Sequence, residues 1–295
     1  MINDRSYMSI KNQITGAAFF SPAFLIFLLG FTYPLIRIVS LALTTRGGSF
    51  GFENVRNVFS DEVLLVAIQN SLIFTVLSVA GHLGIGFFLA GLMNVDLSPA
   101  FIKIMRSAII IPWAISPVVV ATTFRLLYHP ALSVFSDFYS NVPFMAQGVL
   151  SSEQFALYFV ILINIWYATP FYFMLILARM QSIPKEIYEA AAIDGSNYFQ
   201  NMIHISLPIL KPLIVTLAIF DIVAALNTFD LVWLTTMGGP GVSTEVLATY
   251  IYRTAFRGAL NFEYAAAMGI VLLGTIMVIC GGIWYLSRSK NSIGE

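Results

Sequence analysis

Charged residues are scarce in this chain. Asp, Glu, Lys and Arg make up 10% of its 295 residues, and hydrophobic residues make up 58%. Soluble domains are roughly 25% charged. A water-soluble fold of this length could not bury so much apolar surface in one core, so lipid is the solvent that suits the composition. The formal net charge is zero, which leaves no electrostatic footprint for nucleic acid.

Histidine and cysteine are also rare. Three histidines and one cysteine are scattered along the chain, which excludes a disulfide framework and predicts no metal site. The single cysteine, Cys280, lies in the last apolar run and is interpreted as a small apolar filler. The sequence lacks a Gly-rich loop ending in Gly-Lys-Ser/Thr, so the chain cannot hold ATP phosphates by that device.

Long apolar runs are what the sequence does have. A membrane-spanning helix needs about 20 mostly apolar residues. Six runs meet this test, at roughly 17–43, 67–93, 104–128, 155–180, 207–229 and 264–286. The first is longer than the apolar segment of a signal peptide, so it is predicted to be a retained helix. We therefore predict an all-α integral membrane protein with about six transmembrane helices in one domain over residues 1–295, with the core at about 67–287.

The basic residues predict the orientation of the helices. With six spans both termini share one side, and all five lysines of the chain fall on that side. Cytoplasmic loops carry an excess of Lys and Arg, so the termini are predicted to be cytoplasmic. The opposite side, including helix ends, carries Arg37, Arg46, Arg56, Arg125, Arg253 and Arg257.

A polar loop at about 182–208 falls in the cytoplasm in this topology. Pro184 suits the first turn of a helix, and Glu186 and Glu189 suit its early turns, where negative charge complements the helix dipole. Gly195 suits its C-terminal stop. The expected helix is about 15 Å long at 1.5 Å per residue, too short to span a bilayer. On these grounds alone it is either an ordinary interfacial helix or a docking element for a partner.

The same loop carries a specific resemblance. Glu189, Ala190 and Ala191, three residues, Gly195, nine residues, and then Ile205, Leu207 and Pro208 resemble the EAA loop of ABC-importer permeases. In that family the loop forms a coupling helix that docks into a cleft of a cytoplasmic ATPase. The resemblance implies a type I ABC importer permease fold and an ATPase-coupling role for Glu186, Glu189, Ala190, Ala191, Asp194 and Gly195.

Two further stretches are similar to carbohydrate permeases of the maltose and glycerol-phosphate type. They lie at 111–130 and 234–256, and the chain resembles the larger maltose permease subunit without its external insertion. The resemblance implies a location in the bacterial cytoplasmic membrane, a sugar-like substrate and a heteromeric assembly. The implied partners are a second homologous permease, an ATPase homodimer that binds ATP and Mg, and an extracytoplasmic solute-binding protein.

Candidate substrate-lining residues lie in the fourth and fifth runs. Polar groups beside aromatic rings suit a sugar, whose hydroxyls form hydrogen bonds and whose C–H faces stack on rings. In the resembled permease these two helices line the sugar site. Helical spacing places Asp221, Ala225 and Thr228 on one face, with Asn227 on a neighbouring face. The candidates are Asn164, Tyr167, Phe171, Asp221, Ala225, Asn227 and Thr228.

Each of these candidates has an alternative interpretation. The stripe in the fourth run could be helix–helix packing, and Asp221 could bond a neighbouring helix or the second permease. His82 is predicted to be an interhelical hydrogen-bonding residue, and Gly81, Gly86 and Ala90 indicate close helix packing. In the external loop, Gly238, Gly239 and Pro240 predict a chain reversal, to which the resemblance adds a surface facing the binding protein.

Two other functions compete with an importer subunit. A stand-alone ion-coupled secondary transporter would need coupling carboxylates and commonly shows inverted repeats. Asp221 is the mid-membrane carboxylate candidate, and no inverted symmetry is visible. A membrane-embedded enzyme would need a catalytic constellation at one membrane depth, and none gathers there.

Overall fold

The computed structural model describes residues 19–45, 47–94, 98–142, 148–258 and 260–291. Helices dominate this part of the chain, and an isolated antiparallel bridge joins Thr44 to Phe50. The elements, with π and 3₁₀ helices marked η, are η1 Leu28–Thr32, α2 Tyr33–Ala42, α3 Glu53–Val58, α4 Glu62–Leu92, α5 Pro99–Ala114, α6 Pro117–Leu127, α7 Ser136–Ser140, η2 Val149–Ser151, α8 Ala156–Met180, α9 Lys185–Ile193, α10 Tyr198–Gln200, η3 Asn201–Ser206, α11 Leu207–Leu226, α12 Asp230–Thr235, α13 Leu247–Tyr252, η4 Arg253–Arg257 and α14 Phe262–Asn291.

Five described helices are long and apolar enough to cross a membrane, and a bent pair brings the number to six. They are Phe19–Ala42, Glu62–Leu92, Ala156–Met180, Tyr198–Leu226 and Phe262–Tyr285. Each corresponds to a predicted apolar run, although residues 17 and 18 of the first run lie outside the described residues. The all-α membrane fold is therefore confirmed.

The third predicted span, 104–128, is wrong as a single helix. α5 and α6 are bent by 89° at the break between them. Ile115 is extended, with ψ of 143°, and Ser116 has ψ of 137° before Pro117. A proline disfavours the α conformation in the residue that precedes it, so the helix ends and α6 starts afresh with Pro117 in its first turn.

The fifth predicted span, 207–229, also differs from the helix observed. The continuous helix begins at Tyr198 and ends at Leu226, because the π-helical segment η3 joins α10 to α11. Asn227 donates from Nδ2 to the carbonyl of Val223 at 2.8 Å, and Thr228 donates to that of Ala224 at 3.1 Å. Such side-chain bonds compete with helical backbone bonds, and Thr228 lies beyond the helix.

The chain divides into two compact units. The first contains the described residues up to Ser60 together with Thr254–Val271, and the second contains Asp61–Arg253 and the described residues from Leu272 onwards. In the first unit a turn follows α2, where the Asn54 side-chain amide donates to the carbonyl of Thr44 at 2.7 Å. The prediction of a single membrane domain stays a prediction.

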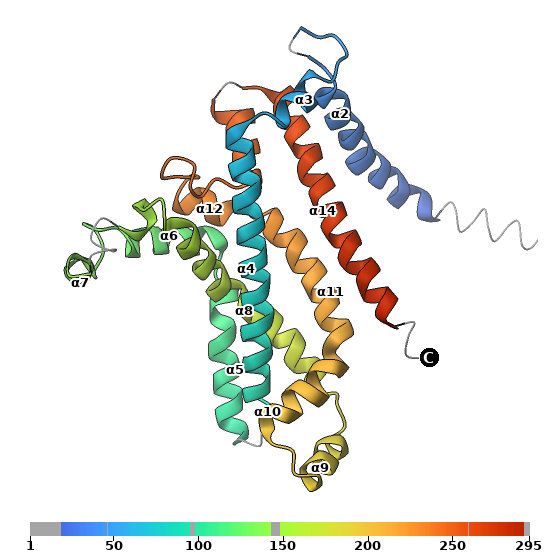
Figure 1. The fold of residues 1–295 in the computed structure, drawn as a ribbon, viewed down its shortest axis with the longest axis vertical. Coiled ribbons are helices and arrows are strands. Elements are labelled where there is room, and N and C mark those ends of the chain that lie inside the picture. Colours follow the sequence, from blue (N-terminus) through green and yellow to red (C-terminus); the bar gives the residue numbers. More distant parts are fainter. Residues whose placement is uncertain (1–18, 46, 95–97, 143–147, 259, 292–295) are drawn as a thin grey trace, which may run out of the picture. The chain divides into compact units, whose positions relative to one another are not determined.

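The second unit is built around α4 and α8, which lie side by side (Figure 1). A Cβ on Gly86 would lie 3.1 Å from the backbone nitrogen of Phe173, so the two helix backbones approach closely there. Ala90 is fully buried at the same interface. The predicted close packing at Gly86 and Ala90 is confirmed.

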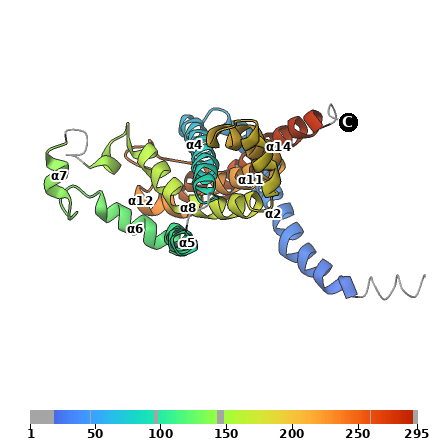
Figure 2. The ribbon, with the colours of Figure 1, turned by 90° about the horizontal axis from the view of Figure 1, so that it is seen from below.

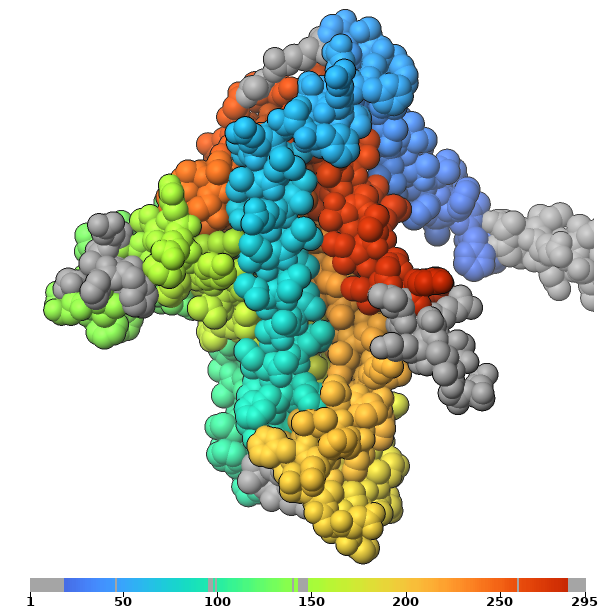
Figure 3. Space-filling model, viewed as in Figure 1, coloured from blue at the N-terminus to red at the C-terminus, as the bar shows by residue number. Residues whose placement is uncertain are grey.

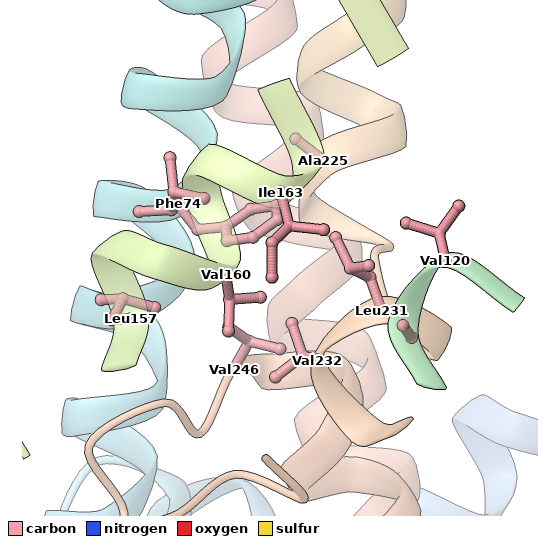
Figure 4. Packing of buried hydrophobic residues seen from close by; sticks show 11 residues of the cluster. Phe74, Val120, Leu157, Val160, Ile163, Ala225, Leu231, Val232 and Val246 are labelled. Carbon is pink, nitrogen blue, oxygen red and sulfur yellow. The ribbon is translucent and has the colours of Figure 1, made fainter. Parts of the chain in front are cut away.

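Apolar side chains from distant parts of the chain fill the centre of this unit (Figure 4). Phe74 of α4 and Val160 of α8 meet Val232 of α12 and Val246 of the loop that follows it. α6 packs against α12, and α7 extends away from α4, α8 and α11 (Figure 2). The cluster thus connects the membrane helices to the loop that contains Gly238.

Replacing Gly86 by valine should lower the free energy of unfolding by roughly 1–3 kcal/mol, because the side chain would overlap the backbone of α8. Gly84→Val is the matched control, since a Cβ there meets nothing within 4 Å among the described residues and the change in intrinsic helix propensity is the same. Thermal unfolding of the purified protein measures both. Equal midpoints for the two variants would contradict the close approach.

Candidate functional site

The predicted coupling segment forms a short exposed helix, α9. Pro184 is its N-cap, with ψ of 136°, and so stands one position before the first turn expected for it. None of the α9 residues is buried. The helix protrudes at one end of the second unit, as Figure 3 shows in yellow.

Backbone geometry ends α9 at a fixed point. Gly195 has φ of +81°, the left-handed conformation that glycine adopts without penalty. The Gly195 N–H donates to the carbonyl of Ala192, and the Ser196 N–H donates to that of Ala191, both at 3.0 Å. These two bonds form a Schellman motif and confirm the predicted stop.

Side chains attach α9 to the membrane helices on both sides. Ile183, just before it, is buried in the cluster that contains Met180 and Leu210. The Tyr188 hydroxyl bonds to the hydroxyl of Ser206 at 2.9 Å. A push or pull on α9 therefore acts on the end of α8 and on η3, which continues into α11.

The outer surface of α9 includes a residue that the sequence analysis did not select. Ile193 is 88% exposed although it is a large apolar side chain. Glu186, Glu189, Ala190, Asp194 and Gly195 are exposed beside it, and Ala191 is partly exposed. Ile193 could have been selected from the sequence, because it is an isoleucine at the end of a predicted docking helix. Exposed apolar groups of this size suit a partner surface.

A buried polar network lies where α4, α8 and α11 meet. His82 Nδ1 lies 2.8 Å from Asp221 Oδ2, and its Nε2 lies 3.2 Å from the Asn164 carbonyl oxygen. The Asn164 side-chain amide donates to the Ser78 hydroxyl at 3.0 Å. The Tyr172 ring stacks on His82, with centroids 5.0 Å apart. The interhelical role predicted for His82 is confirmed.

The structure separates the candidate lining residues into two groups. Asn164, Asp221 and Ala225 are at most 8% exposed. Asp221 is bonded to a neighbouring helix, the alternative considered for it. The other candidates keep exposed surface: Tyr167, Phe171, Asn227 and Thr228. The shared face expected for Asp221, Ala225 and Thr228 is wrong for Thr228, because the helix ends at Leu226. Substrate contact for all seven stays a prediction.

The loop around Gly238 is a chain reversal, as predicted. Gly238 has φ of +85° and is buried, and Gly239 and Pro240 are partly exposed. The Thr244 hydroxyl donates to the Gly239 carbonyl at 2.8 Å and also bonds to the Thr236 hydroxyl at 2.7 Å. The reversal is thus held by hydrogen bonds inside the loop.

The loop is also fixed to α4. The Asn70 side-chain amide lies within 3.0–3.2 Å of the carbonyl oxygens of Val242, Ser243 and Glu245. The Leu247 N–H donates to the Ser71 hydroxyl at 2.8 Å. These contacts join residues more than 170 positions apart in the sequence. The polar side chain of Asn70 within an apolar run could have suggested that it needs a hydrogen-bond partner.

An ion pair lies beneath the reversal. The Glu245 carboxylate, fully buried, pairs with the Arg253 guanidinium, which also donates to the Met237 carbonyl at 2.9 Å. Burial raises the pKa of Glu245 above its usual range, and the Thr249 side chain and the nearby Arg253 oppose that shift less strongly. A Cβ on Gly238 would overlap both charged groups, so this glycine is required for space as well as for φ.

Comparison with known proteins identifies the family. The family model described as binding-protein-dependent transport system inner membrane component matches residues 82–287 of this chain. This chain belongs to that family. The permease is 31% identical to the sulfoquinovosyl glycerol transport system permease protein of Agrobacterium fabrum over 292 residues, covering 97% of this chain and 94% of the relative.

Other relatives agree over most of their length. The permease is 30% identical to the trehalose/maltose transport system permease protein of Thermococcus litoralis, covering 81% of this chain and 79% of the relative. It is 31% identical to the sn-glycerol-3-phosphate transport system permease protein of Pectobacterium atrosepticum, covering 76% and 75%. These relatives support the resemblance drawn from the EAA loop.

A solved structure shares the fold. A bacterial ABC transporter chain involved in the import of the acidic polysaccharide alginate superposes with a TM-score of 0.86 at 26% identity, covering 97% of this chain and 99% of that chain. A second structure of an alginate transporter, in complex with an alginate pentasaccharide-bound periplasmic protein, gives a TM-score of 0.84. The type I permease fold expected from the sequence is thereby confirmed.

Breaking the buried polar network should destabilise the permease. Asp221→Leu leaves the buried His82 Nδ1 without its hydrogen-bond partner and should lower the free energy of unfolding by roughly 1–3 kcal/mol. Asp221→Asn keeps an acceptor oxygen at the same place and should cost less. Thermal unfolding ranks the variants. A leucine variant as stable as wild type would show that the contact contributes nothing.

The Glu245–Arg253 pair should respond asymmetrically to mutation. Arg253→Gln leaves a buried carboxylate without this cation and should lower the free energy of unfolding by roughly 3 kcal/mol at neutral pH. Glu245→Gln removes the buried charge, while Arg253, one-third exposed, stays hydrated, so it should cost less.

Acidification should show whether the buried charge of Glu245 causes the loss of stability in Arg253→Gln. Because the folded-state pKa of Glu245 is raised, the folded protein binds its proton more readily than the unfolded chain. The Arg253→Gln defect should therefore shrink as pH falls through that pKa, and the double variant should show no such relief. Thermal unfolding midpoints from pH 7 to 5 provide the test. A defect that grows on acidification would refute the assignment.

Proposed function

We propose that this permease passes a sugar or sugar derivative across the bacterial cytoplasmic membrane as a subunit of an ATP-driven importer. The observation that carries the proposal is α9, an exposed helix with a fixed C-terminal stop that is attached to α8 and η3. Relatives named for sulfoquinovosyl glycerol, trehalose/maltose and sn-glycerol-3-phosphate support the substrate class.

The proposed assembly contains a second homologous permease, an ATPase homodimer and an extracytoplasmic solute-binding protein. The family description and the alginate transporter bound to its periplasmic protein support the last partner. ATP and Mg would be bound by the ATPase, which would dock on Glu186, Glu189, Ala190, Ala191, Asp194 and Gly195, with Ile193 as an apolar anchor. Both termini and α9 would then lie in the cytoplasm.

Transport in this proposal is alternating access driven from α9. Closure of the ATPase dimer would move α9, and Ile183 and Tyr188 would transmit that movement to α8 and to the helix that begins at Tyr198. Tyr167, Phe171, Asn227 and Thr228 would face the sugar, with Asn164, Asp221 and Ala225 packed behind them. Gly239 and Pro240 would meet the solute-binding protein. Gly238 would shape this loop from below.

The ion-coupled alternative is less well supported. Its coupling carboxylate candidate, Asp221, is buried and paired with His82. Uptake by the purified chain alone, driven by an ion gradient, would favour that alternative. Uptake that requires ATP and the accompanying subunits, together with a sugar retained by the co-purified binding protein, would support the importer.

Gly195→Asp should abolish sugar uptake while the protein still inserts in the membrane. A Cβ at Gly195 meets nothing within 4 Å among the described residues, so the loss would arise at the partner surface, where aspartate adds a negative charge at the C-terminal end of α9. Asparagine has the same shape and adopts positive φ more readily than most residues, so Gly195→Asn should keep much of the uptake.

Uptake of labelled sugar by cells carrying the complete importer, with membrane levels measured by immunoblot, tests this prediction. Ala190→Trp should act like Gly195→Asp, because bulk at an exposed docking position blocks close approach. Normal uptake by both variants would remove the docking role from α9.

A further inference from the structure

A cavity of about 500 Å³ lies behind the coupling helix, at the end of the second unit where α9 protrudes. The end of α4, the first half of α5, the end of α8, α9 and the segment from Tyr198 to Ser206 contribute its walls. Small-molecule sites commonly measure roughly 300–1,000 Å³. Sugar passage along the membrane helices makes no use of this cavity, so its polar groups need another explanation.

Two buried hydrogen-bonding atoms of cavity-lining residues have no hydrogen-bond partner in the part of the chain that the structure describes. They are Nε of Arg106, on α5, and the hydroxyl oxygen of Tyr198, on α10. A buried donor left unsatisfied costs roughly 1–3 kcal/mol, so native proteins seldom keep two in one wall without a ligand. The guanidinium can only donate, and the tyrosine hydroxyl can also donate. Both atoms therefore suit a ligand that supplies acceptor oxygens.

Gly91 makes room for the tyrosine hydroxyl. A Cβ at this position would lie 2.6 Å from the Tyr198 oxygen and 2.3 Å from Cε of Met202. Gly91 is the next-to-last residue of α4, so the absence of a side chain there lets Tyr198 reach the cavity. The position of the Tyr198 hydroxyl is thus set by the packing of α4 against α10 and η3.

The described charges in the wall favour an anion. Among the lining residues that the structure describes, Arg106 and Lys185 are cations and Glu189 is a carboxylate, which gives these residues one net positive charge. Asn94, Gln181 and Asn201 add amide groups that can donate. The C-terminal ends of α4 and α8 bring carbonyl oxygens to the same wall, yet Nε of Arg106 remains unpaired.

We propose that this cavity binds a phosphate group, held by Arg106 and Tyr198. The fork of a guanidinium matches the oxygens of phosphate, and the amides supply further donors. The group could come from a phospholipid headgroup or from a free phosphate in the cytoplasm. Because Tyr188 and Glu189 of α9 form part of the wall, a bound phosphate would bridge the coupling helix to α5 and restrict its movement.

Binding is tested with the full-length permease, purified with the subunits that accompany it. In one arm, native mass spectrometry records whether a phospholipid is retained after delipidation. In the other, inorganic phosphate is titrated at ionic strength held constant with chloride, and the thermal midpoint is followed. Wild type should bind in at least one arm. Arg106→Gln should weaken that binding at least about tenfold, and Tyr198→Phe about three- to tenfold.

Lys103→Gln is the matched control, because Lys103 is an exposed cation on α5 that does not line the cavity. It should leave binding unchanged. Retained lipid lost in Arg106→Gln identifies the headgroup as the source, and a phosphate-dependent midpoint lost in that variant identifies a free phosphate. The proposal is overturned if wild type binds in neither arm, or if the Lys103 and Arg106 variants lose binding equally.

If Arg106→Gln does not assemble, Tyr198→Phe decides the question. It removes an unpartnered hydroxyl and keeps the ring, so without phosphate it should be as stable as wild type. Binding to this variant with wild-type affinity would also overturn the proposal.

Discussion

Lipid offers no hydrogen bonds, so polar side chains in a spanning helix are stabilised by partners inside the protein. One face of α4 shows how strongly this constraint orders the permease. Small and polar residues recur there at helical spacing and are all buried: Ser71, Thr75, Ser78, His82, Gly86 and Ala90. At one end of this stripe, Ser71 bonds to the loop around Gly238. In the middle, His82 belongs to the polar network, and at Gly86 the backbone of α8 approaches closely. α8 and α11 are positioned by their contacts with α4 along this stripe.

The two functional ends of the permease use different means to stay rigid. The loop around Gly238 is fixed by side chains, through Asn70, Ser71 and the Glu245–Arg253 pair. The predicted coupling helix is held by its backbone stop at Gly195, by the buried Ile183 just before it and by the hydroxyl contact of Tyr188. A helix of nine residues is marginal on its own, so these attachments hold α9 in place. The phosphate proposed behind it would add a further attachment.

Several features could be predicted from the sequence because they depend on local physics. Apolar runs of sufficient length predicted the spans, since a helix satisfies its own backbone hydrogen bonds in lipid. Gly195 predicted the end of α9, since glycine adopts positive φ without penalty. The break in the third run shows the limit of this reasoning: Pro117 lies within that run, but whether a proline kinks a span or divides it by 89° depends on the neighbouring elements that α6 packs against.

What the sequence by itself determined is the membrane class, the short helix α9 and the family, because each is carried by residues close together in the chain. Only the tertiary structure decided the partners of the polar residues. Asp221 is 139 residues from His82, and Asn70 is 172–175 residues from its three carbonyl partners. Arg106 and Tyr198 meet at one cavity although 91 residues separate them. Helical spacing gives the face on which a residue lies, but the packing of one helix on another decides what that face contacts.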